Sequence, residues 1–169
     1  MKKFQRGFTL IELLIVIAVL GILAAGVLAT IDPFEQFKKA RDTNTRNTMV
    51  ELYNSFIRYN ANHGTWPWSG GGTVPNAATL SSITGTLISS IINDGELKSG
   101  FASNLDGTVL TSSTVTFITS PGETVAVCFL PQSKTIRKDA NTKYSVNGDE
   151  NSQNCPGNGT SGNCYWCAK

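Results

Sequence analysis

The chain has 169 residues, 40% of them hydrophobic, which is enough for one domain with a packed core and an attached segment. This composition excludes a disordered or collagen-like chain. The formal net charge is +2, but Lys2, Lys3 and Arg6 contribute three of the 14 basic residues, so 11 remain against 12 acidic ones. The near-neutral remainder argues against a dedicated polyanion binder, and one histidine, His63, is little equipment for an enzyme.

An apolar segment runs from Phe8 to Ile31, and Glu12 is its only charged residue. As a helix, these residues span about 36 Å, enough to cross a bilayer. An ionised side chain inside a bilayer costs about 2.5–3.5 kcal/mol on insertion scales, so Glu12 needs a partner or a task. A secretory signal peptide with a cleavage site at Ala29 is the alternative, but it leaves Glu12 unexplained.

The sequence GFTLIE at 7–12, between a short basic leader and the apolar run, resembles the processing motif of type IV prepilins. The resemblance implies that a prepilin peptidase on the cytoplasmic face cuts between Gly7 and Phe8 and methylates the new amino terminus at Phe8. It also implies that Glu12 pairs with the positive amino terminus of a neighbouring subunit. Paired in a helix bundle of low dielectric, each charge relieves the desolvation of the other.

The same resemblance implies a structural role. Before assembly, the subunit would cross the inner (cytoplasmic) membrane once, with its amino terminus in the cytoplasm. It would then join copies of itself in an extracellular, pilus-like helical filament, with an assembly platform and a motor ATPase as indirect partners. A pseudopilin of a type II secretion or DNA-uptake machine is one alternative. A membrane-anchored adhesin or DNA-binding minor pilin is another, and a secreted enzyme is a distant third.

Beyond Pro33, apolar residues at helical spacings predict one long helix, with Gly64 suited to a left-handed cap at its end. Charged residues four apart on this helix are interpreted as ion pairs on a solvated face. These pairs are Glu35–Lys39, Lys38–Asp42 and Asp42–Arg46.

Many members of the family have a proline 21 residues after the processed terminus, where this chain has Ala29. A break in the helix is therefore expected either nearer the membrane surface, around Pro33, or at Gly21 and Gly26. The resulting map has a leader (1–7), a transmembrane and assembly half of the long helix (8–31), its outer half (32–63) and a head (64–169).

The head is expected to begin with a short helix and to continue as antiparallel strands. Apolar residues from Leu80 to Ile91 step by three or four, and Gly95 marks the end of that helix. Residues 69–76 are expected to form a loop before this helix. Alternating patterns predict strands at 115–117, 125–130, 144–146 and 164–167, with turns at 121–122 and 147–148. The fold class is α+β, and the family resemblance implies a long amino-terminal helix packed on a small carboxy-terminal antiparallel sheet.

Four cysteines, an even number, lie in the last quarter of the chain: Cys128, Cys155, Cys164 and Cys167. Beyond a membrane-targeting segment, they favour two disulfides in an oxidising compartment, and a four-sulfur zinc site is the alternative. Of three connectivities we favour Cys155–Cys164, which flanks a flexible eight-residue loop, with Cys128–Cys167, which joins a strand to the terminal strand.

No recognisable spacing of nucleophile and base, phosphate-binding glycine loop or HExxH motif occurs, so neither an enzyme nor a cofactor is expected. Two polar clusters are interpreted as ordinary solvated surface. Four possible calcium ligands are interpreted as a solvated turn: Asn147, Asp149, Glu150 and Asn151. Four basic residues are interpreted as a solvated strand face, which argues against nucleic acid as a partner: Lys134, Arg137, Lys138 and Lys143. Four large aromatics are expected to pack in the head: Trp66, Trp68, Tyr165 and Trp166.

Overall fold

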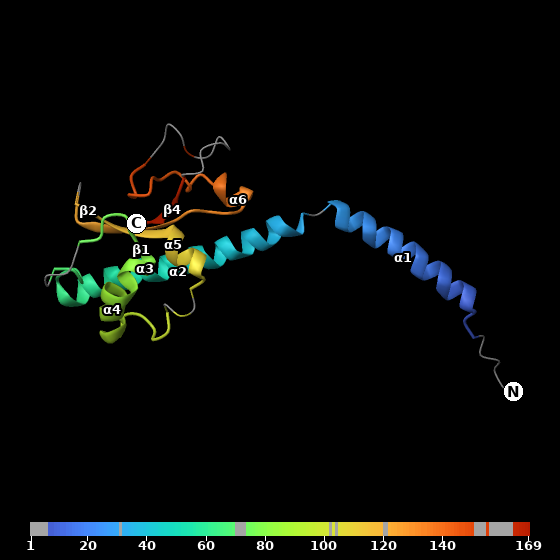
Figure 1. Cartoon of the computed structure of the whole chain (residues 1–169), viewed down its shortest axis with the longest axis horizontal. Coiled ribbons are helices and arrows are strands. Elements are labelled where there is room, and N and C mark those ends of the chain that lie inside the picture. The colour runs from blue at the N-terminus through green and yellow to red at the C-terminus, as the bar shows by residue number, and fades with distance from the viewer. Residues whose placement is uncertain are drawn as a thin grey trace. The chain divides into compact units, whose positions relative to one another are not determined.

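The computed structural model describes residues 7–30, 32–69, 74–101, 103, 105–119, 122–150, 155 and 164–169 (Figure 1). The chain divides into two compact units, Met1–Gln36 and Phe37–Lys169. Several expectations from the sequence lie outside the described residues. They concern leader residues 1–6, part of the loop at 69–76, Pro121 of a predicted turn, Asn151 of the possible calcium ligands, and the loop 156–163 between two cysteines.

Two helices form the amino-terminal part of the chain: α1 (Leu10–Thr30) and α2 (Pro33–His63). Helix α1 continues through Gly21 and Gly26, so these glycines do not interrupt it. Helix α2 starts at Pro33, which has no N–H and so cannot continue the hydrogen bonds of a preceding helical turn. Asp32 caps the new helix, because its Oδ1 accepts hydrogen bonds from Phe34 N (3.1 Å) and Glu35 N (3.4 Å). At its other end, Gly64 has a φ of 67°, which confirms the predicted left-handed cap.

The predicted helix that ends near Gly95 is present as three consecutive helical segments: α3 (Leu80–Ile83), the π-helix η1 (Thr84–Ile88) and α4 (Ser89–Asn93). The π-helix contains Gly85, the residue that weakens the helical pattern in the sequence. Two further short helices, α5 (Gly107–Ser112) and α6 (Lys134–Arg137), were not predicted.

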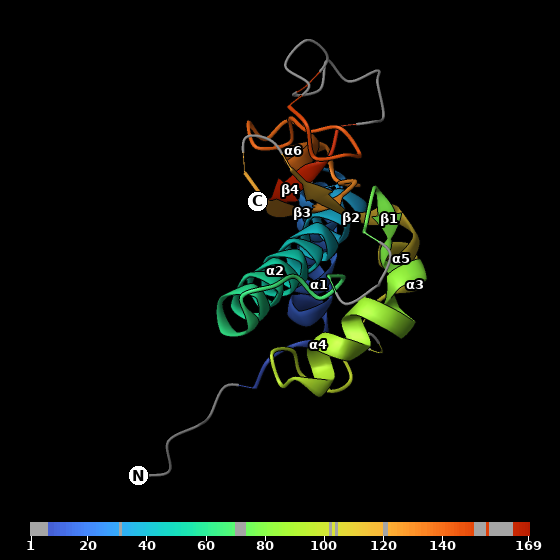
Figure 2. The ribbon, with the colours of Figure 1, turned by 90° about the vertical axis from the view of Figure 1, so that its left-hand side faces the viewer.

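Four antiparallel strands form one sheet in the order β1-β2-β3-β4 (Figure 2). The strands are β1 (Ala78–Thr79), β2 (Ser113–Ile118), β3 (Thr124–Phe129) and β4 (Trp166–Ala168). Strands β2, β3 and β4 lie where alternation predicts them, whereas β1 has only two residues and no pattern of its own. The α+β class and the antiparallel sheet are thus confirmed.

The core of the head lies between α2 and one face of the sheet. Met49, Leu52 and Phe56 of α2 are fully buried together with Val115 and Val127 of the sheet. The tryptophans add their large apolar surfaces to this core, as expected: Trp66 stacks on Trp68 with ring centroids 5.2 Å apart, and Trp166 lies 5.6 Å from Phe129. Alternation along the strands therefore buries the side that faces α2.

The opposite face of the sheet is covered by residues 133–150, which follow β3 and which Figures 1 and 2 show on the side away from α2. Ala126 and Cys128 of β3 and Cys167 of β4 form a small apolar cluster there. Gly148, with a φ of 79°, closes a turn on this cluster, and a Cβ at Gly148 would lie only 2.7 Å from Ala126 Cβ. Only glycine fits this turn without strain.

Three expectations from the sequence are wrong. Residues 144–146 are not a strand, because Tyr144 makes only isolated bridges to Glu150 and Tyr165. The basic residues do not lie on a strand face, because Lys134 and Arg137 belong to α6 and Lys143 pairs with Glu150 at 2.6 Å. That ion pair is also the main reason why the pKa of Lys143 is raised and the pKa of Glu150 is lowered.

The third wrong expectation concerns Asp42, which is buried and does not lie on a solvated helix face. Its carboxylate accepts hydrogen bonds from Gln132 N (3.0 Å) and Ser133 N (2.7 Å), directly before α6. Arg46, the predicted ion partner, lies over the ring of Trp166 at 5.1 Å. Asp42 therefore ties α2 to a segment 90 residues further along the chain.

Candidate functional site

The amino terminus of α1 is closed by a capping box made of Thr9 and Glu12. Glu12 Oε2 accepts hydrogen bonds from Thr9 N (2.9 Å) and Thr9 Oγ1 (2.8 Å), and Glu12 N donates to Thr9 Oγ1 (3.3 Å). Such reciprocal bonds satisfy donors that the first turn of a helix would otherwise leave free. The sequence Thr9-Leu10-Ile11-Glu12 has the T-x-x-E spacing of a capping box, so this cap could have been predicted from the sequence. Among the residues considered in the sequence, Glu12 was assigned a role and Thr9 was not.

The capping box determines how Glu12 is presented. Both bonds from Thr9 end on Oε2, and within the described residues no donor reaches Oε1. The carboxylate is held at the start of the apolar helix by its own chain, with one oxygen open to a donor from outside. An additional cation can therefore approach Glu12 without displacing Thr9.

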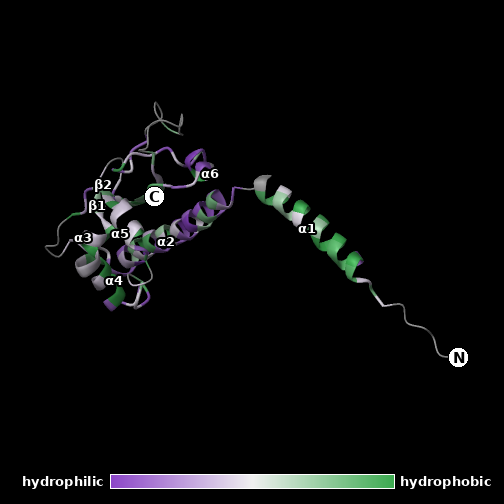
Figure 3. Cartoon of the chain, turned by 45° about the vertical axis from the view of Figure 1, so that its right-hand side comes forward, coloured by the Kyte–Doolittle hydropathy of each residue, from purple (hydrophilic) through white to green (hydrophobic). Residues whose placement is uncertain are grey.

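Helix α1 consists almost entirely of apolar residues, so its ribbon in Figure 3 is mostly in the hydrophobic colour along its whole length. Leu10–Leu28 is long and apolar enough to cross a membrane, and none of this stretch is buried in the protein. A helix that is hydrophobic all round requires lipid or other helices around it. Within the described residues, no part of the chain buries Leu10–Leu28.

The two residues of the predicted cleavage point lie directly before the helix. Gly7 and Phe8 are exposed, and the backbone from Gly7 to Thr9 is not helical. Phe8 exposes 82% of its surface. The Gly7–Phe8 peptide bond is accordingly accessible and not protected by helical hydrogen bonds. The structure thus brings Gly7, Phe8 and Glu12 together within one turn of the helix start.

The four cysteines lie far along the chain, in the head. Cys128 is bonded to Cys167, its direct neighbour across β3 and β4, with Cα atoms 4.1 Å apart. Cys155 is bonded to Cys164, nine residues later, with Cα atoms 5.8 Å apart. This is the connectivity favoured from the sequence, and no cysteine is left for a four-sulfur zinc site.

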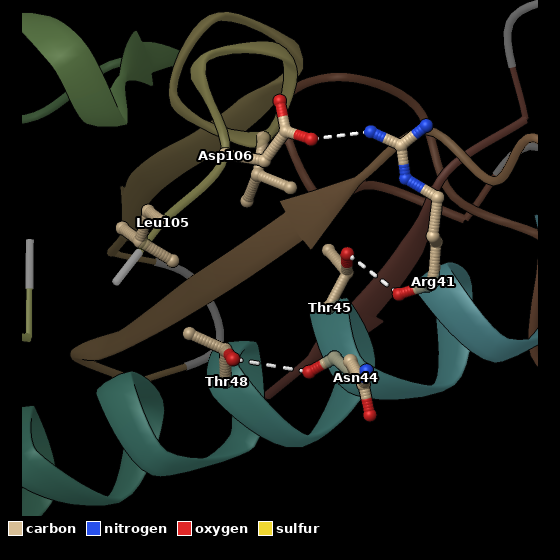
Figure 4. Close-up of a pocket in the computed structure, with 7 residues that line it drawn as sticks. Arg41, Asn44, Thr45, Thr48, Leu105 and Asp106 are labelled. Atoms are coloured by element: carbon tan, nitrogen blue, oxygen red, sulfur yellow. Dashed lines mark hydrogen bonds and ion pairs between the residues drawn. The ribbon is translucent and has the colours of Figure 1, made fainter. Parts of the chain in front are cut away.

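The head also carries a pocket of about 230 Å³ between α2 and the start of α5 (Figure 4). Arg41 of α2 pairs with Asp106, whose Oδ1 also caps α5 by accepting a hydrogen bond from Thr108 N (2.8 Å). The Thr108 N–H, and after it Arg41, lower the pKa of the Asp106 carboxyl. Within the described residues, no group of three or more His, Cys, Asp or Glu side chains has the arrangement of a metal site.

Comparison with known proteins relates the amino-terminal part of the chain to a described family. Residues 2–28 match the family model of the prokaryotic N-terminal methylation motif. A fimbrial protein of Neisseria meningitidis serogroup B is 38% identical over 101 residues, which cover 59% of this chain and 54% of that protein. The type IV major pilin protein PilE of Neisseria gonorrhoeae is 36% identical over 92 residues, 54% of this chain and 52% of PilE.

A third relative, the fimbrial protein EcpC of Eikenella corrodens, is 33% identical over 101 residues, which cover 54% of this chain and 56% of EcpC. The chain spans about half the length of the curated relatives it matches. No solved structure matches it significantly.

Proposed function

The methylation motif and the similarity to neisserial pilins support a type IV pilin family for this chain, and on that premise we propose that it is a structural subunit of a type IV pilus-like filament. The observation that carries the proposal is α1, an apolar helix whose stretch Leu10–Leu28 is not buried in the protein and which has one acid, Glu12, at its start. Such a surface suits lipid before assembly and a bundle of identical helices afterwards.

Maturation begins with removal of residues 1–7. A prepilin peptidase on the cytoplasmic side of the membrane cuts between Gly7 and Phe8 and methylates the amino group of Phe8. The exposed, non-helical backbone at this bond supports the assignment, because a peptidase needs access to an extended substrate. Cleavage leaves a positive amine one residue before the capping box of Thr9 and Glu12.

Assembly then pairs Glu12 with the amine of Phe8 in a neighbouring subunit. In hydrocarbon, a lone carboxylate or a lone ammonium is costly, and the cost of each falls when the two meet. The bonds from Thr9 offset part of the cost while the subunit is stored in the membrane. The open Oε1 of Glu12 then accepts the amine of the next subunit.

The localisation follows from these steps. The unassembled subunit crosses the inner membrane once through α1, with its amino terminus in the cytoplasm, and the assembled subunit is part of an extracellular filament. An assembly platform and a motor ATPase act on it without being part of the filament. The names of the relatives favour a pilus subunit over a pseudopilin, and the role is structural, not enzymatic.

The test is the intact mass of the mature protein, measured on filaments that have been sheared from cells and examined by electron microscopy. We expect filaments whose main component starts at Phe8 and carries one additional methyl group. A mature terminus at Thr30 would assign the chain to the ordinary secreted class and refute the proposal. Filaments that lack this protein would refute it as well.

A further inference from the structure

A groove runs along α2 in the head, on the side of the helix next to the core-facing side. Two neighbouring pockets of about 230 and 250 Å³ share Thr48 and Leu105, so together they form one groove. Arg41, Asn44, Thr48 and Glu51 supply its α2 side at spacings of three and four residues, which keeps them on one helix face. The opposite side is made by Lys98, Ser99, Phe101, Leu105, Asp106 and Val109.

The groove suits an apolar occupant although many of its residues are polar. The hydroxyl of Thr45 donates to Arg41 O and that of Thr48 to Asn44 O, each at 3.0 Å, so both are satisfied within α2. Arg41 and Asp106 satisfy each other at the rim (Figure 4). The methyl groups of the threonines and the side chains of Leu105 and Val109 remain to line the groove.

Phe37, one turn before Arg41 on the same helix face, is an exposed aromatic side chain. It exposes 68% of its surface, so its own chain does not cover it. Helical side chains lean toward the amino terminus, so Phe37 leans away from the groove of its own subunit. It lies eight residues before Thr45, which corresponds to about 12 Å along the helix.

We infer that Phe37 of one subunit docks into the groove of a second copy of this chain, shifted by about 12 Å along a parallel α2 helix. The contact rests on the filament function proposed above. It joins different surfaces on the two copies, and such a heterologous contact repeats without closing into a dimer, as a filament requires. Arg41 lines the same groove, so a docked ring would have a guanidinium beside it.

Charge complementarity supports the second copy as the occupant. Glu51, an exposed acid, lines the far end of the groove. In a copy shifted by eight residues, Arg41, which shares a helix face with Phe37, reaches the level of position 49, within one turn of Glu51. The basic residue that follows Phe37 on this face thus approaches an acid of the subunit that receives it, and charges of opposite sign fix the register.

The test uses photocrosslinking in filaments of the full chain. Phe37 is replaced by benzoylphenylalanine in one population of subunits, which is co-assembled with subunits labelled with nitrogen-15. Irradiated, sheared filaments are analysed by peptide mass spectrometry, and the same probe at Lys39, on another side of the helix, is the matched control. We expect the probe at Phe37 to link labelled peptides from 41–51 or 98–109, and the probe at Lys39 to give a different pattern.

A second measurement compares filament yield at equal subunit levels. Truncation of an interface anchor weakens each contact about tenfold or more, so Phe37→Ala is expected to lower the yield at least tenfold and Phe37→Leu to retain most of it. Crosslinks that avoid the groove, or an unchanged yield for Phe37→Ala, would overturn the docking and leave the filament function intact. Failure of the wild-type chain to form filaments would overturn both.

Discussion

Replacement of Asp42 by alanine tests the most distant connection in the head. The carboxylate accepts hydrogen bonds from the backbone N–H groups of Gln132 and Ser133, and Asp42 exposes only 3% of its surface. Asp42→Ala leaves two donors without a partner in a largely buried place, at a cost of about 1–3 kcal/mol each. We expect the free energy of unfolding of the head to fall by about 2–4 kcal/mol, which lowers the melting temperature by roughly 10 °C.

The assay is thermal and urea unfolding of the full-length protein in detergent, followed by tryptophan fluorescence. All three tryptophans, at positions 66, 68 and 166, belong to the head, so the signal reports that unit alone. Glu51→Ala, an exposed acid on the same helix, is the matched control and should change stability by less than about 0.5 kcal/mol. A change below about 0.5 kcal/mol for Asp42→Ala would refute a structural role for these two hydrogen bonds. Such a small effect is what the ion pairs on a solvated helix face would give, since each contributes only a few tenths of a kcal/mol.

Three further predictions follow from individual residues. Glu12→Ala should leave membrane insertion unchanged or improved and reduce filament yield, measured in cells without a wild-type copy; normal filaments would exclude the pairing with the amine of Phe8. Gly148→Ala should destabilise the head by about 2–5 kcal/mol in urea unfolding, because φ is 79° and the new Cβ would lie 2.7 Å from Ala126 Cβ; an unchanged urea midpoint would exclude this close approach. The depressed pKa of Asp106 means that its contribution to stability is present above the unfolded pKa, about 3.9, and is lost as the pH falls through the folded value. Carboxyl NMR should accordingly show that Arg41→Met raises the pKa of Asp106, and no change would exclude Arg41 as a cause.

The elements that could be predicted from the sequence are those specified by local patterns. Helix α2 follows from apolar spacing and from Gly64, and β2 and β3 follow from alternation around a turn. The helical stretch at 80–93 was predicted despite Gly85, because its apolar residues keep one face toward the core. The resemblance to the prepilin motif likewise needed only six consecutive residues.

The elements that were missed depend on contacts between distant residues. Helix α6 is held by the Asp42 carboxylate from 90 residues earlier in the chain, and α5 starts at Asp106, which is paired with Arg41. Short helices of this kind have little stability of their own, so their patterns are weak. Strand pairing has the same limit, since the segment at Tyr144 alternates like a strand but finds a partner only at single bridges.

Asp42 and Glu12 show how two acids on consecutive helices can serve different purposes. Both carboxylate oxygens of Asp42 accept hydrogen bonds from backbone N–H groups of the head, so its negative charge is stabilised within the folded head. Glu12 is bonded only through Oε2, to a residue three positions away, and stays exposed. A charge satisfied internally contributes to stability, whereas a charge left partly open can contribute to association. Because the two acids lie in separate compact units, loss of Asp42 should be seen in the unfolding of the head, and loss of Glu12 in filament assembly with the head unchanged.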